Sequence, residues 1–313
     1  MLTHLIILLD DTSVSYCHYN GVNERRLISL DELKVGIVWA MKENLNVQFV
    51  YPNYELPTEY NNLIDTIDHI KIKPVELSDN AEVVVLTDWK EKQLEVINGV
   101  MCIVRSSRDE LEEYSDSIKE LLKSGGRVVI VLTDIETFND ADLLSYKNLL
   151  EDYVNELCED YQTGKSVQFS LLTDRIMLND MNNCNAGVNN ITLAPNGRFY
   201  LCPAFYYDNP SDDVGDLKRG LNVKNQNLLD LNHAPICRIC DAYHCKRCIW
   251  LNSRLTLDLN TPSHQQCVIA HLERNASKLL QQKLKEKGIR LNPSHEIREI
   301  EYLDPFYIVN KWK

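Results

Sequence analysis

Apolar runs and amphipathic stretches alternate along the first half of the chain. Residues 5–9 form an unbroken apolar run that ends in Asp10 and Asp11, which is the pattern of a strand buried on both faces. Strands are expected at 5–9, 47–51, 70–73, 83–87, 101–105, 127–133 and 167–172. Because helices are expected between these strands, the pattern predicts an α/β fold with a parallel sheet and helices outside it.

Capping residues mark the starts of three of the expected helices. Ser29 and Ser107 are each followed three residues later by a glutamate, the capping-box pattern, and Asn139 or Asp140 caps a third helix. The apolar positions of the first of these helices recur at helical spacing and are Leu30, Leu33, Ile37 and Met41. Helices are expected at about 30–41, 58–67, 92–97, 107–126 and 139–164.

The pattern changes after residue 183. The stretch 190–202 reads as a hairpin, because Asn196-Gly197 supplies the positive φ angles of a tight turn. Residues 203–250 show little helical periodicity, whereas 263–287 predict a basic amphipathic helix and 297–312 a last strand. The sequence therefore favours two main modules, with a boundary near 183.

Cysteines dominate the second module. Seven of the ten cysteines of the chain lie between 184 and 267, and they are Cys184, Cys202, Cys237, Cys240, Cys245, Cys248 and Cys267. Two Cys-x-x-Cys pairs stand only four residues apart, and this spacing allows both sulfurs of a pair to face one metal centre. Metal ligation would replace the apolar core that so loop-rich a segment lacks.

Disulfides and simple burial are the alternatives to metal binding. Disulfides require an oxidising compartment, but the apolar start of the chain lacks the features of a signal peptide and is too short for a membrane span. We therefore expect a cytoplasmic protein that does not bind membranes. Cys102 and Cys158 fall within a buried strand and on an apolar helix face, so we expect them to be packing residues.

The charge of the chain is unevenly distributed. Residues 1–183 contain 16 Lys+Arg and 33 Asp+Glu, a net charge of −17, whereas 184–313 contain 17 and 13, a net charge of +4. An acidic first half repels a phosphate backbone, so nucleic-acid binding is not expected.

The cysteine pattern resembles the SPASM domain, the iron–sulfur module of many radical S-adenosylmethionine (AdoMet) enzymes that modify ribosomal peptides. Cys184, Gly197, Cys202 and the later cysteines follow its order, although the gaps before Cys245 and Cys248 are each one residue short. The resemblance implies one complete site from Cys237, Cys240, Cys245 and Cys267, and a second, incomplete one from Cys184, Cys202 and Cys248. The implied cofactors are 4Fe–4S iron–sulfur clusters, with zinc as the alternative for thiolate ligands.

The same resemblance implies a partial (β/α)6 barrel of the radical AdoMet type over 1–183, a SPASM-like domain over 184–272, and a C-terminal helix and tail over 273–313. The positions of the three catalytic-cluster cysteines hold Asp10, Val14 and Cys17, and the Gly-Gly-Glu motif for AdoMet falls on 53–55 as Asn-Tyr-Glu. Because one thiolate cannot hold a cluster and Tyr54 obstructs a close backbone approach, we expect neither AdoMet binding nor conventional radical chemistry.

Other polar residues give weaker indications. Asp10, Asp11 and Glu55 are placed at strand ends, where α/β folds carry their sites, but ordinary strand-end polarity explains them equally well. His244 could complete the incomplete metal site, although a solvated loop histidine is the expectation we prefer. The sequence identifies no catalytic residue.

Two functions of different class follow. In the first, which the resemblance to the maturases of bacterial CXXX repeat peptides suggests, the protein belongs to a peptide maturation system. It binds a cysteine-rich precursor peptide through its metal domain and acts on the peptide or presents it to a partner modification enzyme. In the second, zinc staples a structural interaction module that has no catalytic activity.

Overall fold

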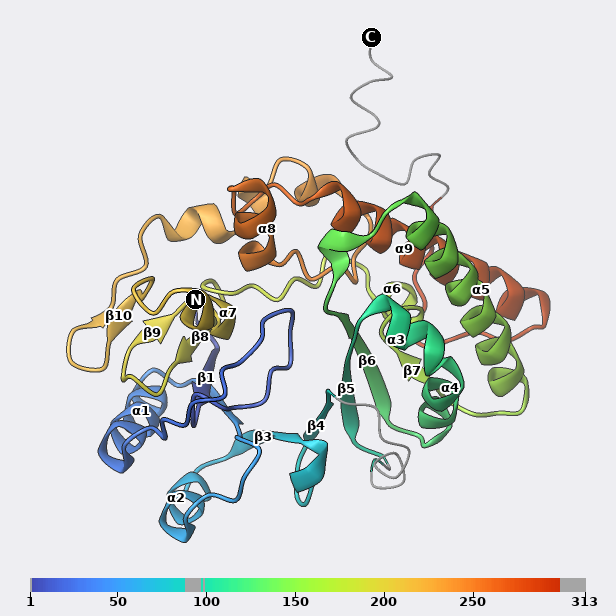
Figure 1. Cartoon of the computed structure of the whole chain (residues 1–313). Helices are drawn as coiled ribbons and strands as arrows, with labels where there is room; N and C mark the ends of the chain where they lie inside the picture. The colour runs from blue at the N-terminus through green and yellow to red at the C-terminus, as the bar shows by residue number, and fades with distance from the viewer. Residues whose placement is uncertain (1, 88–96, 98, 299–313) are drawn as a thin grey trace. The chain divides into compact units, whose positions relative to one another are not determined.

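The computed structural model describes residues 2–87, 97 and 99–298 of the 313-residue chain (Figure 1). The chain divides into two compact units, each assembled from an early and a late stretch of sequence. The first unit comprises Met1–Asp88 and Asn185–Asp230, and the second Trp89–Cys184 and Leu231–Lys313. Each compact unit combines residues from more than one of the predicted modules 1–183, 184–272 and 273–313. These modules stay predictions from the sequence.

Parallel strands form the framework of the first unit. Four of them pair side by side in the order β4-β3-β2-β1, and they are β1 (His4–Leu8), β2 (Asn46–Val50), β3 (His69–Pro74) and β4 (Val83–Leu86). The apolar runs of the sequence predict all four within about a residue at most ends.

The 190–202 hairpin joins this same sheet. Its first strand β8 (Asn190–Leu193) pairs in parallel with β1, and its second strand β9 (Phe199–Tyr200) pairs antiparallel with β8. Gly197 makes the turn with a φ of 73°, a backbone region that glycine enters without steric cost. The outer edge of β9 is covered, because Val214 N–H donates to the Phe199 carbonyl at 2.7 Å. The hairpin is thus part of the α/β sheet and offers no free strand edge at this point.

Helix α1 (Leu30–Lys42) covers the sheet of the first unit and starts where the capping box predicts. The Ser29 side chain accepts a hydrogen bond from the Glu32 N–H at 3.2 Å. Leu33 and Ile37 are buried as expected, but the prediction for Met41 is wrong, because its side chain is 62% exposed. Helix α2 (Thr58–Ile64) ends three residues earlier than expected.

One apolar core holds these elements together. The buried side chains of β1, α1, β2, α2, β8 and β9 form a continuous cluster that includes Leu5, Ile37, Phe49, Ile64 and Phe199. A buried aliphatic or aromatic side chain stabilises a fold by roughly 1.5–3 kcal/mol, so this cluster fixes the strand ends above it.

The second unit repeats the strand–helix pattern. Its strands β5 (Met101–Ser106), β6 (Arg127–Leu132) and β7 (Gln168–Phe169) pair in parallel. The expected strand 167–172 is shorter than predicted, since helix α6 (Thr173–Met177) follows at once. The expected helix 107–126 is two helices, α3 (Arg108–Glu113) and α4 (Ser115–Lys123), which break at Tyr114.

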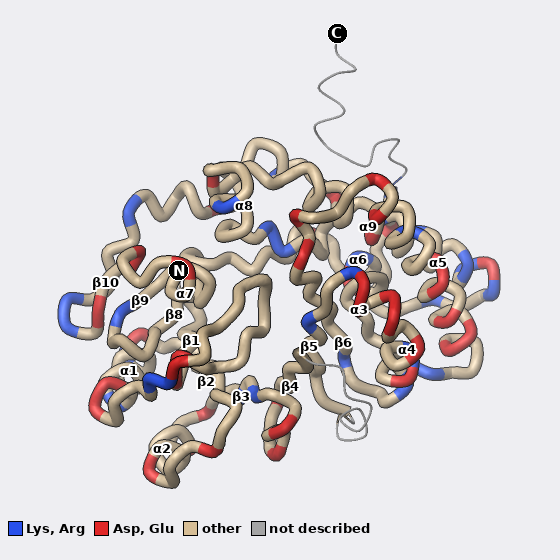
Figure 2. Tube along the Cα trace, in the orientation of Figure 1, with Lys and Arg blue, Asp and Glu red and all other residues tan. Residues whose placement is uncertain are grey.

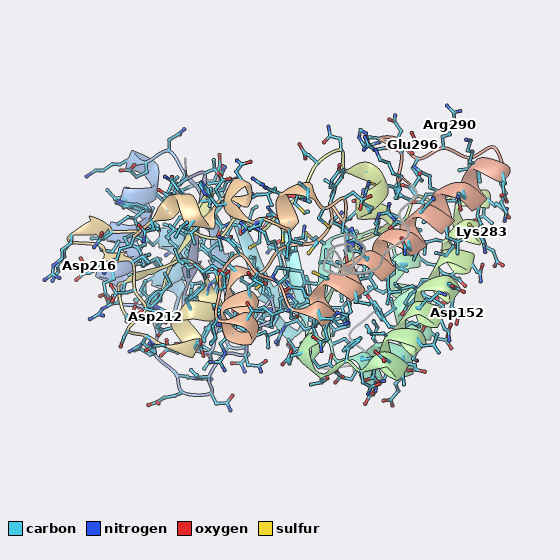
Figure 3. The ribbon with its side chains drawn as sticks, turned by 90° about the horizontal axis from the view of Figure 1, so that it is seen from above. Asp152, Asp212, Asp216, Lys283, Arg290 and Glu296 are labelled. Carbon is cyan, nitrogen blue, oxygen red and sulfur yellow. The ribbon has the colours of Figure 1, made fainter. Side chains whose placement is uncertain are left out.

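Two long helices pack against each other in the second unit. They are α5 (Asp140–Gln162), capped by Asn139, and α9 (His264–Glu286), capped by Ser263. Figure 3 shows Lys283 on α9 beside the α5 helix that carries Asp152, and the Lys283 ammonium donates to Asn155 Oδ1 at 2.6 Å. Acidic residues gather on α3, α4 and α5, which accounts for much of the negative charge of the first half of the sequence (Figure 2).

Short elements complete the described chain. They are α7 (Pro203–Asp208), β10 (Gly215–Asp216), β11 (Gly220–Leu221), α8 (Ile249–Thr256) and the 3-10 turns Val75–Leu77, Ile135–Thr137, Gln226–Leu229, Leu231–His233 and Cys237–Ile239. The expected helix 92–97 and strand 297–312 fall almost wholly outside the described residues. No helix that the structure describes has the length and apolar character of a membrane span.

Candidate functional site

Four cysteines of the second unit line one cavity. Cys237 lies in the 3-10 turn Cys237–Ile239, Cys240 and Cys245 lie in the loop that follows, and Cys267 lies in the first turn of α9. The remaining wall is largely apolar and includes Met181, Ile236, Ala242, Pro262 and Ala270. The four thiols that the family pattern groups into one complete site are therefore neighbours around a single enclosed space.

The cavity disfavours charged thiolates unless a cation enters. Burial raises the pKa of the Cys240 thiol to about 11 and that of Cys245 to about 12. Burial also raises the pKa of Cys237, and the nearby Arg247 guanidinium opposes this shift. Four sulfur donors, two from buried and two from half-buried cysteines, are the ligand type of an iron–sulfur cluster or of zinc, whose positive charge would stabilise the thiolates. No three His, Cys, Asp or Glu side chains in the described part of the chain are arranged to hold a single metal ion.

Two buried arginines fix the loop that carries these cysteines. Arg274 of α9 donates from Nε to both carboxylate oxygens of Asp241, at 2.8 and 2.7 Å. Arg175 of α6 donates from Nε to the Asp241 carbonyl at 2.5 Å. Both arginines are at most 2% exposed, so the residue after Cys240 is clamped between two helices. Sequence reasoning missed this clamp, because Arg274 and Arg175 are separated from Asp241 by 33 and 66 residues and no local pattern pairs them with it.

Histidines on either side of the loop are buried. His271 Nε2 lies 3.3 Å from Cys240 Sγ, and the Ala242 N–H donates to the same sulfur at 3.4 Å. His244 is only 6% exposed, and its Nε2 lies 3.0 Å from Glu273 Oε2. The expectation of a solvated loop histidine is therefore wrong at His244, because Glu273 of α9 holds the ring in the interior.

Cys184 and Cys248 are also neighbours in the second unit. The Cys184 N–H donates to the Lys246 carbonyl at 3.2 Å, which places it beside the second Cys-x-x-Cys pair. Cys248 caps α8, and its sulfur accepts from the Leu251 N–H at 3.5 Å. Burial, and after it the neighbouring Cys184, raises the pKa of Cys248 to about 12. Cys202, the third member of the predicted set, belongs to the first unit, where it precedes α7.

A different arrangement occupies the carboxyl end of β1 in the first unit. Asp10 is fully buried, and its Oδ1 accepts from both the backbone N–H and the hydroxyl of Thr12, at 2.8 and 2.6 Å. Its Oδ2 accepts from the Tyr54 hydroxyl at 3.0 Å. Both carboxylate oxygens are therefore engaged by the protein itself.

Asp11 forms a second local network. Its carboxylate contacts Arg26 at 3.1 Å and accepts a hydrogen bond from the Tyr206 hydroxyl, and Arg26 donates to that hydroxyl as well. Burial raises the pKa of Asp11, and the hydrogen bond from Tyr206 and the charge of Arg26 oppose the shift. Glu55 is exposed, in contrast, so the three predicted strand-end acids do not form one site.

The residues at the catalytic-cluster positions do not fit a cluster. Asp10 is saturated with hydrogen bonds, Val14 is buried and offers no donor, and only Cys17 has a sulfur. Tyr54 stands where the family pattern has a glycine, and its hydroxyl donates a hydrogen bond to Asp10. We therefore derive no chemistry from an AdoMet-cleaving cluster at this position.

Cys102 and Cys158 lie outside both arrangements. They are 0% and 3% exposed and pack in β5 and α5, as expected for small apolar residues.

Comparison with solved structures places this geometry in a known fold. The structure of native anSMEcpe with bound AdoMet and Cp18Cys peptide matches with a TM-score of 0.59 and 11% identity, covering 92% of this chain and 98% of that chain. A hexahistidine-tagged anSMEcpe with bound AdoMet matches with a TM-score of 0.60 and 12% identity, covering 93% and 100%. Streptococcus suis SuiB bound to precursor peptide SuiA gives 0.45 and 13%, covering 85% and 76%. No protein-family model matches the sequence, and no curated protein matches it significantly.

The likeness to anSMEcpe extends over nearly the whole of both chains. At these identities it concerns the fold. It confirms the predicted fold class, an α/β chain with a mostly parallel sheet, shared with the fold of anSMEcpe.

Proposed function

We propose that this protein is a component of a peptide maturation system that binds a cysteine-rich precursor peptide through a SPASM-like metal centre. It does so without conventional radical AdoMet catalysis. The observation that carries the proposal is the contrast between two sites. Four thiols surround one buried cavity in the second unit, whereas the catalytic-cluster position holds Asp10, which Tyr54 ties down.

The proposed metal centres are based on the cysteine sulfurs that could ligate them. Cys237, Cys240, Cys245 and Cys267 hold one centre, a 4Fe–4S cluster, with all four of its protein positions filled by sulfur. Cys184 and Cys248 hold a second centre, to which the sequence pattern adds Cys202. When bound, a cluster with only three protein thiolates supplies one open iron position to an external ligand.

The peptide partner is supported by the fold. The anSMEcpe structure with the matching fold contains a bound Cp18Cys peptide. A cysteine-rich peptide suits the second centre here, because a peptide thiolate is a ligand for an iron position that the protein leaves open. The protein then acts on the peptide or presents it to a partner enzyme.

The test is peptide binding with and without the peptide thiols. A synthetic peptide in which cysteine recurs at every fourth position, and its serine version, are titrated by calorimetry into protein purified without oxygen. We expect the cysteine peptide to bind at least tenfold more tightly, and Cys248→Ser to abolish the difference. Equal binding of both peptides removes the thiolate mechanism, and no binding of either favours the zinc-stapled interaction module.

A further inference from the structure

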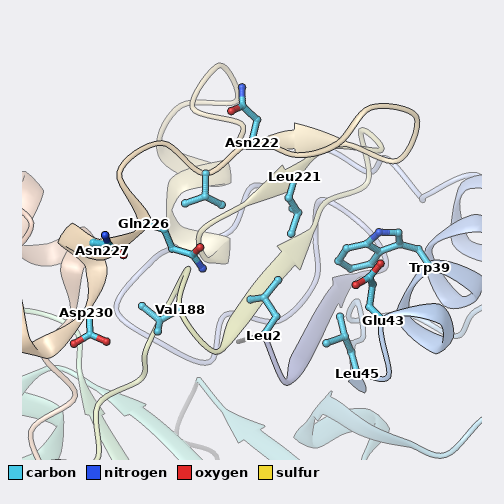
Figure 4. A pocket seen from close by; sticks show the side chains of 11 residues that line it. Leu2, Trp39, Glu43, Leu45, Val188, Leu221, Asn222, Gln226, Asn227 and Asp230 are labelled. Atoms are coloured by element: carbon cyan, nitrogen blue, oxygen red, sulfur yellow. The ribbon is translucent and has the colours of Figure 1, made fainter.

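A large pocket of the first unit lies outside both sites described above. It has a volume of about 770 Å³, within the range of roughly 300–1,000 Å³ that is usual for ligand sites. Its floor and walls are apolar and are formed by Leu2, Trp39, Leu45, Val188, Leu221 and Val223 (Figure 4). Leu221 ends β11 (Gly220–Leu221), and Val223 follows two residues later, so this turn of the chain brings two apolar side chains to the pocket.

Polar groups surround this apolar floor. They are Glu43, Asn222, Gln226, Asn227 and Asp230, and no lysine or arginine is among the described residues that line the pocket. Figure 4 shows Trp39 and Glu43 on the α1 side, with Gln226, Asn227 and Asp230 on the other. The rim therefore combines two carboxylates with three side-chain amides.

The Glu43 carboxylate does not stabilise the fold. Its side chain is exposed and forms no ion pair or hydrogen bond within the described part of the chain. It is also the C-terminal cap residue of α1, where a negative charge opposes the helix dipole instead of stabilising the helix. An acid that the fold does not need, at the edge of an apolar pocket, points to a cationic ligand.

Trp39 strengthens this argument. It precedes Glu43 by four residues on α1, so the two side chains are neighbours on one helix face. The indole packs on Phe199 with ring centroids 4.7 Å apart, which holds it in place at the pocket wall. An ammonium or guanidinium group placed here would meet both an aromatic face and a carboxylate.

We infer that this pocket binds an extended peptide segment in which aliphatic and basic residues alternate. The aliphatic side chains enter the apolar part of the pocket, a basic side chain binds between Trp39 and Glu43, and the amide of Asn222 meets the peptide backbone, whereas Gln226 Nε2 donates to the Gly187 carbonyl at 3.1 Å. The inference rests on the proposed function, because such a segment would be a recognition sequence of the precursor peptide that is separate from its cysteines.

The experiment uses a fluorescein-labelled hexapeptide of alternating leucine and arginine, without cysteine, and its citrulline version, which keeps the shape but not the charge. Fluorescence polarisation is measured with the full chain. We expect the citrulline peptide, which lacks all three guanidinium charges, and the Glu43→Gln variant, which lacks the one carboxylate, each to weaken binding about fivefold to tenfold. Glu59→Gln, an exposed acid of α2 outside the pocket, should leave binding unchanged.

A charge-reversed protein and peptide distinguish lost binding from lost folding. Glu43→Arg should prefer a leucine–glutamate hexapeptide over the arginine one, and Glu43→Gln should melt at the same or a higher temperature than the wild type. Equal binding of the arginine and citrulline peptides, no binding at all, or full displacement by spermidine would overturn the inference. Because the probe lacks cysteine, Cys248→Ser should bind it normally, so failure here is distinct from failure of the metal-centred proposal.

Discussion

The Tyr54 hydroxyl donates a hydrogen bond to Asp10 Oδ2 at 3.0 Å, across a sequence separation of 44 residues. In the family pattern, the first position is a glycine that approaches AdoMet and the second is a cysteine that ligates a cluster. In this chain Tyr54 stands at the glycine position and Asp10 at the cysteine position, and their side chains form a hydrogen bond with each other. The loop after β1 is thereby held by the protein's own polar groups, because Thr12 engages the remaining oxygen of Asp10.

Removal of this bond should destabilise the first unit without any effect on the metal centre. Tyr54→Phe leaves a buried carboxylate oxygen without its donor, and such losses cost about 1–3 kcal/mol. Urea unfolding measures the change, and iron content should stay constant. If Asp10→Asn and the double variant with Tyr54→Phe show additive losses, the two side chains do not interact and the bond is not the cause.

The same bond predicts a dependence of stability on high pH. Burial, and after it the hydrogen bond and charge of Asp10, raises the pKa of Tyr54 from 10.0 to about 12. A pKa that is raised on folding contributes stability that is fully present below the ordinary value and is lost as pH rises through the folded value. The stability difference between wild type and Tyr54→Phe should therefore shrink between pH 10 and 12, and a constant difference would contradict the assignment.

AdoMet should not bind the wild-type chain. Asp10 and Val14 supply no thiolate and Tyr54 fills the glycine position, so calorimetry should show no heat of binding at micromolar AdoMet. Tyr54→Gly opens space without adding ligands, and we expect it to bind no AdoMet either. The formation of 5′-deoxyadenosine by reduced wild-type protein would refute this prediction.

The arginine clamp should matter far more than surface ion pairs. Arg274→Gln removes the Nε–H that both carboxylate oxygens of Asp241 share, while Arg175 Nη2 stays 3.7 Å from Oδ2, so we expect a loss of about 1.5–3 kcal/mol. Arg219→Gln, which removes an exposed partner of Asp216, is the matched control and should change stability by less than about 0.5 kcal/mol. Thermal melts that show equal small effects would mean that the clamp does not order the cysteine loop.

Local signals account for the parts of the fold that the sequence predicts well. The caps at Ser29, Ser107 and Asn139 are all present, because a capping box involves residues only three apart. Met41 is exposed because periodicity identifies a helical stripe but does not fix where that stripe faces the core. Helix α7 has six residues and no apolar period, so no pattern indicates it.

Distant contacts account for what the sequence does not predict. The family resemblance, and not the spacing alone, groups Cys237, Cys240, Cys245 and Cys267, and these four thiols line one cavity of the structure. The Tyr54–Asp10 bond and the Arg274–Asp241 clamp join side chains separated by 44 and 33 residues, and no local pattern encodes such pairs. The burial of His244 likewise depends on Glu273, which lies 29 residues away on another element.

Metal and sulfide analysis decides whether Cys237, Cys240, Cys245 and Cys267 hold an iron–sulfur centre. Iron, zinc and acid-labile sulfide are measured on protein purified without oxygen, for the wild type, Cys240→Ser and the matched control Cys158→Ser. We expect iron and sulfide in equal amounts in the wild type and in Cys158→Ser, and a loss of about half or more in Cys240→Ser, because a thiolate site contributes folding free energy through its metal. Zinc without sulfide, or unchanged iron and sulfide in Cys240→Ser, would contradict this expectation.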